Sequence, residues 1–366
     1  MIDKKTFTRE WIEDRSNHFK TGKSKGNSEL IEKVINALYL LEKLVSSGID
    51  MIFKGGTSLV LLLDEVHRFS IDIDIILLND NGLDALMDAI ISDNYIFQRY
   101  EKNERKNTKG IPKAHYKFYF TSNLDNTEKY ILLDILFEEN PYDELITQPI
   151  ESAFLLSSGD AINVVMPSIN CILGDKLTAF APKTTGIPYG ADKELEIIKQ
   201  LFDVNNLFDH ISNLNHVRQT FNRIAQNELN YRGLADVTIQ DVLNDIYDTS
   251  FVIAMRGAHM EEEFKQLELG IKRVKSHIFS KNFIIEDALL CASKAAYCAV
   301  LMMRDDRVIE KFDASIDLSK DKIEIDGFTK YFNTIKKITP EGFFYWKKAV
   351  ELKNNNLNST SFYENH

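Results

Sequence analysis

The chain has 366 residues, and its 44 Lys and Arg against 55 Asp and Glu give a formal net charge of −11 at pH 7. Hydrophobic residues make up 44% and charged residues 27%, a balance typical of folded globular proteins, which excludes disordered, collagen-like and low-complexity chains. The net negative charge argues against nucleic-acid binding over the whole surface, although it is compatible with a local basic patch.

The first half of the chain alternates between helix-like and strand-like patterns. Apolar residues recur at helical spacing in some stretches, and short apolar runs bounded by turn residues predict strands in others. In chain order we expect a helix at 29–45, strands at 49–53 and 71–78, a helix at 83–91, and strands at 115–121, 129–137 and 161–165. Because residues 123–126 are turn-like, the strands on either side of them are expected to form an antiparallel hairpin.

Helical patterns dominate the second half. Pro167 precedes the first of them, consistent with the tolerance of proline at a helix start. Helices are expected at 168–180, 194–208, 217–228, 239–255, 261–279, 286–303 and 340–352. The sequence therefore predicts an α+β protein, with a mixed-sheet domain of residues 1–180 and an α-helical domain of residues 181–366.

Neither export nor a membrane span is indicated. The three cysteines are odd in number and have no zinc-ligand spacing, which argues against a disulfide framework. Residues 1–20 are charged, without the apolar core of a signal peptide. The most apolar helical stretch, at 288–303, is interrupted by Lys294 and falls short of the roughly 20 apolar residues that a span needs. We expect a cytoplasmic protein with no membrane partner.

Two acidic residues lie two positions apart in the strand expected at 71–78. Because side chains alternate along a strand, Asp72 and Asp74 should share one face while the intervening isoleucines are buried on the other. Two carboxylates so close repel each other, and a divalent cation removes that cost. Hard oxygen ligands of this kind suit Mg²⁺ or Mn²⁺, which also bind substrate phosphates.

A glycine pair precedes the acids and has the character of a phosphate-binding turn. Gly55 and Gly56 lack a Cβ, so a phosphate can approach the backbone closely, and the short helix that follows presents its free N–H groups. Thr57 and Ser58 can add hydroxyl donors, and Lys54 can add positive charge. Taken singly, the glycine pair is a common tight turn and the acid pair a common solvated face. Their succession predicts a nucleoside triphosphate site with two metal-binding carboxylates.

Two segments resemble the AbiEii-type nucleotidyltransferases of the DNA polymerase β-like superfamily. They are the segment from Lys54 to Leu59 and the motif Arg-Phe-Ser-x-Asp-x-Asp that ends at Asp74. These include toxins of type IV toxin–antitoxin and phage abortive-infection systems, with the MenT toxins as relatives. The resemblance covers about residues 50–210. It implies a polymerase β-like mixed sheet with flanking helices, NTP as substrate and a cognate antitoxin.

The resemblance also implies roles for residues outside the first motif. Asp134, an isolated acid in an apolar strand, matches the third metal-binding carboxylate of the family, although an ordinary ion-pairing role remains open. Lys176 matches a helical lysine that contacts nucleotide phosphates, with a surface lysine as the alternative. Asp203 matches the second acid of a later motif whose first acid is replaced here by Gln200, which leaves its role open between orienting Lys176 and positioning the acceptor or metal.

Two further segments have competing interpretations. A basic stretch is interleaved with tyrosines and could hold an RNA backbone or be a solvated hairpin arm. Its basic residues are Arg99, Lys102, Arg105, Lys106, Lys109, Lys113 and Lys117. The loop at 184–190 could be a mobile loop over the site or a plain connection.

The sequence thus predicts a Mg²⁺-dependent nucleotidyltransferase that moves a nucleotide from an NTP to an acceptor hydroxyl. By resemblance the acceptor is RNA, a tRNA 3′ end among the candidates. Transfer to a protein or a small molecule, or nucleotide binding without turnover, remains open.

Overall fold

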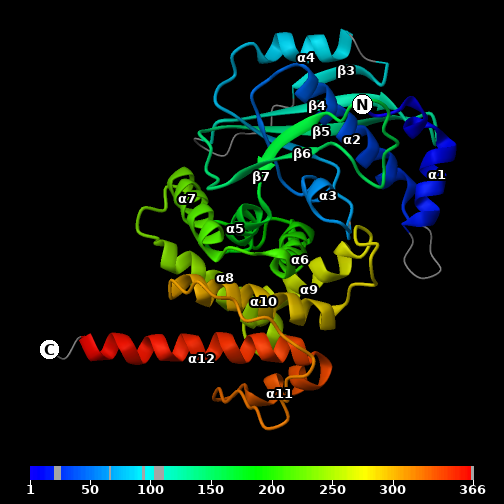
Figure 1. Cartoon of the computed structure of the whole chain (residues 1–366). Helices are drawn as coiled ribbons and strands as arrows, with labels where there is room; N and C mark the ends of the chain where they lie inside the picture. Colours follow the sequence, from blue (N-terminus) through cyan, green and yellow to red (C-terminus); the bar gives the residue numbers. More distant parts are fainter. Residues whose placement is uncertain (20–25, 66, 93–94, 103–110, 364–366) are drawn as a thin grey trace. The chain divides into compact units, whose positions relative to one another are not determined.

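The computed structural model describes residues 1–19, 26–65, 67–92, 95–102 and 111–363, with side chains as far as residue 354. The chain forms two compact units. The first comprises residues 1–168 and 276–282, and the second comprises residues 169–275 and 283–366. The division drawn from sequence lay after residue 180, at the end of a helix that the structure places wholly within the second unit. The elements are labelled in Figure 1.

A five-stranded mixed sheet organises the first unit. Its strand order is β1-β2-β5-β4-β3. Strands β2 and β5 are parallel, and the other neighbours are antiparallel. The strands are β1 (Ile52–Lys54), β2 (Ile73–Leu77), β3 (Phe97–Lys102), β4 (Lys113–Thr121) and β5 (Glu128–Phe137). The predicted α+β class, the mixed sheet and the β4–β5 hairpin are confirmed.

The sheet has one apolar face. Phe53, Ile75, Ile135 and Ala114 lie opposite one another on β1, β2, β5 and β4, and all are buried. Helix α2 (Ser28–Ser46), which contacts β2 and β5, supplies much of the same core. Since side chains alternate, the residues next to these four along each strand point to the other face.

Smaller elements complete the first unit. They are η1 (Lys4–Phe7), α1 (Arg9–His18), α3 (Leu59–Leu62), α4 (Leu83–Ser92) and the hairpin β6 (Leu145–Pro149) with β7 (Asn163–Pro167). Helix α1 was not predicted, because only Ile12 and Ser16 of it are buried and its apolar periodicity is weak. Residues 276–282 join this unit through a bridge between Arg68 and Ile278 and through Phe279, whose ring lies 4.5 Å from that of Phe69.

The second unit is helical. Its helices are α5 (Ile169–Ala179), α6 (Glu194–His210), α7 (Leu214–Arg232), α8 (Ile239–Met255), α9 (Glu261–Val274), α10 (Ile285–Met303), α11 (Thr329–Ile338) and α12 (Pro340–Tyr363). Helix α10 is buried along most of its length against α6, α8 and α12, which explains why its sequence is so apolar. Among the described residues, no helix combines the length and the apolar character that crossing a membrane requires.

Candidate active site

Four polar side chains form a row across the face of the sheet that is opposite the apolar core. Lys54 on β1 pairs in register with Asp74 on β2, Asp74 pairs with Asp134 on β5, and Asp134 pairs with His115 on β4. Residues directly opposite on neighbouring strands point to the same face, with Cβ atoms about 5 Å apart. The pairing therefore brings two of the predicted metal-binding acids side by side and flanks them with basic residues.

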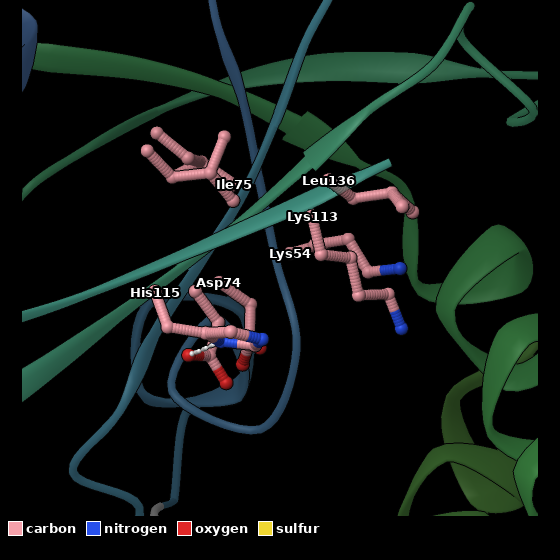
Figure 2. A pocket seen from close by; sticks show the side chains of 8 residues that line it. Lys54, Asp74, Ile75, Lys113, His115 and Leu136 are labelled. Atoms are coloured by element: carbon pink, nitrogen blue, oxygen red, sulfur yellow. Dashed lines mark hydrogen bonds and ion pairs between the residues drawn. The ribbon is translucent and has the colours of Figure 1, made fainter. Parts of the chain in front are cut away.

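The row lines a pocket of about 110 Å³. Figure 2 shows the ends of the Asp74 and His115 side chains close together, while Lys54 and Lys113 extend in a common direction with their ammonium groups away from these two residues. The pocket is lined by Lys54, Asp74, Ile75, Lys113, His115, Asp134, Ile135 and Leu136. Pockets that enclose a small organic ligand measure roughly 300–1,000 Å³. This one is smaller, so a nucleotide bound here would extend beyond it.

The imidazole of His115 contacts the carboxylate of Asp134 and orients it. Its Nδ1 lies 2.6 Å from Oδ1 of Asp134, and both side chains are partly buried. A ring nitrogen that contacts one carboxylate oxygen fixes the rotation of the carboxylate. Sequence reasoning missed His115 as a site residue, since a lone histidine in a strand carries no motif.

The glycine turn at the end of β1 lies against the side chain of Asp74 and restricts its position. Gly55 has φ +81°, a conformation that favours glycine, and a Cβ placed on it would lie 2.7 Å from Cγ of Asp74. A Cβ on Gly56 would lie 2.6 Å from Nη2 of Arg68 and 2.7 Å from Oγ of Ser70. The backbone of the turn therefore lies directly against the acid of β2, and a larger residue at Gly55 would displace the Asp74 side chain.

Thr57 and Ser58 are buried in this turn, and their hydroxyls act within it. The Thr57 hydroxyl donates to the carbonyl of Asp72 over 2.6 Å, and the Ser58 hydroxyl donates to the carbonyl of Gly55 over 2.7 Å. Each hydroxyl proton thus has an acceptor inside the protein. Helix α3, which follows, has four residues, so its summed dipole is small. Phosphate binding by Thr57 and Ser58 stays a prediction, and their backbone N–H groups are the better candidates for it.

Asp72 lies one residue before β2 and is exposed. Within the described residues, no three or more His, Cys, Asp or Glu side chains are grouped as a metal site would require. The pocket therefore offers the Asp74–Asp134 pair, and Asp72, which is not among the residues that line it, stays a predicted metal ligand. Two carboxylates fit Mg²⁺, which is commonly held by one or two of them and completed by water and substrate phosphates.

Lys176 and Asp203 meet within the helical unit. Nζ of Lys176 on α5 lies 3.0 Å from Oδ2 of Asp203 on α6, and both residues are buried. The expectation that Asp203 could orient Lys176 agrees with this ion pair. Their part in catalysis stays a prediction.

The loop at 184–190 is anchored in the helical unit. The Lys183 N–H and the Thr184 hydroxyl donate to one oxygen of Asp245 over 2.8 and 2.9 Å, and the Thr185 hydroxyl donates to a carbonyl of α5. At its end, the Gly190 N–H donates to Gln266. These bonds favour a fixed connection over the mobile loop that the sequence left open.

The basic stretch is partly neutralised. Arg99 is paired with Glu101 and Glu128, so its charge is already balanced within the sheet. Lys117 lies 4.7 Å from the centre of the Tyr130 ring. Arg105, Lys106 and Lys109 lie outside the described residues. Lys113, at the start of β4, is the basic residue of this stretch that reaches the pocket.

The chain was compared with known proteins. Among curated proteins no significant sequence match is found. Solved structures with similarity include JHP933 from Helicobacter pylori, with 15% identity, a TM-score of 0.46 and coverage of 77% of this chain and 96% of that one. MenT4, a nucleotidyltransferase toxin from Mycobacterium tuberculosis, has 13% identity, a TM-score of 0.38 and coverage of 75% and 94%. These scores are low, and no residue role is drawn from them.

The sequence itself matches a family description, "Nucleotidyl transferase AbiEii toxin, Type IV TA system", over residues 39–287. The match spans more than half of the chain and contains the glycine turn, the paired acids, Lys176 and Asp203. The chain therefore belongs to the AbiEii family, the nucleotidyltransferase toxins of type IV toxin–antitoxin systems.

Proposed function

We propose that this nucleotidyltransferase uses Mg²⁺ or Mn²⁺ to transfer a nucleotide from an NTP to a hydroxyl of RNA, with a tRNA 3′ end as a candidate acceptor. The observation that supports the proposal best is the register that sets Asp74 beside Asp134, next to the Gly55–Gly56 turn. A carboxylate pair next to a glycine turn whose backbone N–H groups could bind phosphate is the combination that nucleotidyl transfer needs.

Asp74 and Asp134, with Asp72 as a further predicted ligand, would hold the metal. A bound divalent cation would neutralise charge on the phosphates and lower the pKa of the attacking hydroxyl. The chain's own part is to keep both carboxylates in place: Gly55 contacts Asp74, and His115 contacts Asp134. Such fixed geometry lets the site stabilise developing charge without reorganising during the reaction.

The triphosphate would lie on the glycine turn. Gly55, Gly56, Thr57 and Ser58 would offer backbone N–H groups, and Lys54 would add positive charge. In the helical unit, Lys176 is proposed to act on nucleotide phosphates, as the family resemblance implies, with Asp203 holding its ammonium group in place. The acceptor hydroxyl loses its proton to solvent and attacks the α-phosphorus in line, the new P–O bond forms, and the bond to the β-phosphate breaks, which releases pyrophosphate.

Incubation of the protein with α-labelled NTPs, Mg²⁺ and total RNA tests the proposal. Labelled RNA that loses its label on ribonuclease treatment is the expected result. Label on protein, or on a small molecule, would replace RNA as the acceptor, and the absence of any label despite NTP binding would favour a nucleotide-binding regulator. Co-expression of the neighbouring gene product, followed by growth and labelling assays, tests for the antitoxin partner that the family implies.

The variant Asp74→Asn removes one of the paired charges with little change in volume. We expect loss of labelling by about 10³-fold or more, the scale on which removing a preorganised charge group lowers turnover. Asp80→Asn, an exposed acid just beyond β2, is the matched control and should label normally. Normal labelling by Asp74→Asn, with an unchanged melting temperature in both variants, would refute this site.

A further inference from the structure

The glycine turn identifies one side of the acid pair as the side of the leaving group. Gly55 follows Lys54 at the end of β1 and contacts Asp74, so a triphosphate held by the turn would extend toward β1 and the beginning of β2. In an in-line displacement the attacking and leaving oxygens lie on opposite sides of the phosphorus. The acceptor hydroxyl must then approach from the side that faces β5 and β4.

Lys113 lies on that opposite side. It pairs in register with Leu136, two residues beyond Asp134, and so lies on the same face as the acids. From the acid pair, the glycine turn is displaced toward β1 and the start of β2, whereas Lys113 is displaced toward β4 and the end of β5. The two positions are diagonally opposite across the carboxylates.

The side chain of Lys113 is exposed at the pocket. It lines the pocket and extends away from Asp74 and His115 (Figure 2). Within the described residues, no carboxylate forms an ion pair with Lys113, whereas Arg99 of the same stretch is paired twice. An ammonium group with no ion-pair partner among the described residues, on the same face as two carboxylates, is suited to an anionic group that arrives with the acceptor.

We propose that Lys113 binds a backbone phosphate of the RNA acceptor and so aligns its terminal hydroxyl with the α-phosphorus. This inference rests on the proposed function and adds to it the side from which the acceptor enters and a residue that holds it. The acceptor class that it requires is a strand with at least one phosphate 5′ to the attacking hydroxyl.

The test compares Lys113→Gln with a matched variant. Lys117→Gln removes the same charge from the same strand and the same face, two residues from His115 in the other direction, at a position that does not line the pocket. The acceptor is a single-stranded RNA oligonucleotide that the wild-type protein labels. KM for this RNA, KM for the NTP, and binding of the RNA without NTP, by fluorescence anisotropy over a range of salt concentrations, are measured for the three proteins.

For Lys113→Gln we expect KM for the RNA to rise about tenfold, as for the loss of one phosphate contact, with KM for the NTP unchanged. The slope of log K against log salt should fall in magnitude by about 0.7, the value for one phosphate of a single strand. Lys117→Gln should resemble the wild type in all three measurements.

Two outcomes overturn the inference, and they are distinguishable. If the wild type labels no RNA, the proposed function fails and the inference fails with it. If RNA is labelled but Lys113→Gln changes KM for the NTP instead of that for the RNA, or if Lys117→Gln has the same effect, the role of Lys113 is refuted while the proposed function stands.

Discussion

Asp74 and Asp134 are directly opposite residues on two parallel neighbouring strands, β2 and β5. A shift of this pairing by one residue would turn one carboxylate into the apolar core, so the packing of that core fixes the relation between the two acids. Each acid also has its own brace: the backbone of Gly55 contacts Asp74, and the imidazole of His115 contacts Asp134. The predictions below test these braces and two buried carboxylates of the helical unit.

His115 should act as a positioning residue for Asp134. His115→Ala removes the contact at 2.6 Å, and we expect the Mg²⁺ concentration for half-maximal activity to rise about 10- to 100-fold, as for other residues that orient metal ligands. His115→Asn, whose side-chain nitrogen can replace Nδ1, should recover most of the loss. Mn²⁺ binding followed by electron paramagnetic resonance gives a readout that does not depend on turnover. Equal behaviour of the Ala and Asn variants would mean that the contact with Asp134 has no positioning role.

Comparison of Gly55→Ala with Gly48→Ala should distinguish the effect of backbone strain from the effect of displacing the Asp74 carboxylate. Gly55 has φ +81° and its Cβ would overlap the carboxylate of Asp74, whereas Gly48 has φ +76° with nothing within 4 Å of its Cβ. Gly48→Ala should cost about 1–2 kcal/mol of unfolding free energy because it forces an L-residue into the left-handed region, and Gly55→Ala should cost more because its Cβ also overlaps the Asp74 carboxylate. Only Gly55→Ala should lower turnover, by about 10²-fold, since a misplaced reacting group costs that much. Urea unfolding and labelling rates of the two variants check this, and equal turnover would contradict it.

Lys176 and Asp203 should be strongly coupled in stability. Their charged groups are 3.0 Å apart and buried, so Lys176→Met removes the ion-pair partner of a buried carboxylate and should cost about 3–5 kcal/mol. Adding Asp203→Leu should restore a large part of that loss. Urea unfolding of the two single variants and the double variant gives the coupling free energy between Lys176 and Asp203. A coupling free energy of zero, meaning that the two single effects simply add, would contradict the prediction. A double variant with restored stability but no transfer would support the predicted role of the pair in nucleotide binding.

Asp245 should make stability depend on pH. Burial raises the pKa of this carboxyl group above its usual value, with the bonds from Thr184, Lys183 and Thr249 acting in the opposite direction. Because the folded state then holds the proton more tightly than the unfolded state, stability from this group is complete below the unfolded pKa of about 3.9 and declines as pH rises through the folded pKa. Asp245→Asn should therefore gain stability relative to the wild type as pH rises from 4 toward 7. Urea unfolding at several pH values measures the difference, and a constant difference would contradict the prediction.

The β4–β5 hairpin shows how much of the site the sequence already contained. The turn residues predicted the hairpin, and once Thr121 is opposite Glu128, counting back along β4 and forward along β5 places His115 opposite Asp134. The histidine could therefore have been found from the turn. Sequence patterns missed it because a lone histidine in an alternating strand has no chemical motif, and only its partner reveals its role.

The glycine turn was predicted as a phosphate cradle, but the direction of two hydroxyls in it was not. Thr57 and Ser58 donate to carbonyls of Asp72 and Gly55 instead of pointing outward. A sequence lists donors without showing their acceptors. Which acceptor is nearest depends on the path of the chain after the turn, so burial of these two side chains decided the outcome.

By itself, the sequence determined the alternation that gives each strand one apolar and one polar face, and the local turns that follow from glycine and asparagine. These are properties of neighbouring residues, and steric preference and solvation act on them within a few positions. Only the tertiary structure decided that β2 and β5 pair in parallel with Asp74 opposite Asp134, and that residues 276–282 join the first unit. No short turn connects those segments, so their register depends on how the apolar face packs on α2 and on the hydrogen bonds that this packing allows.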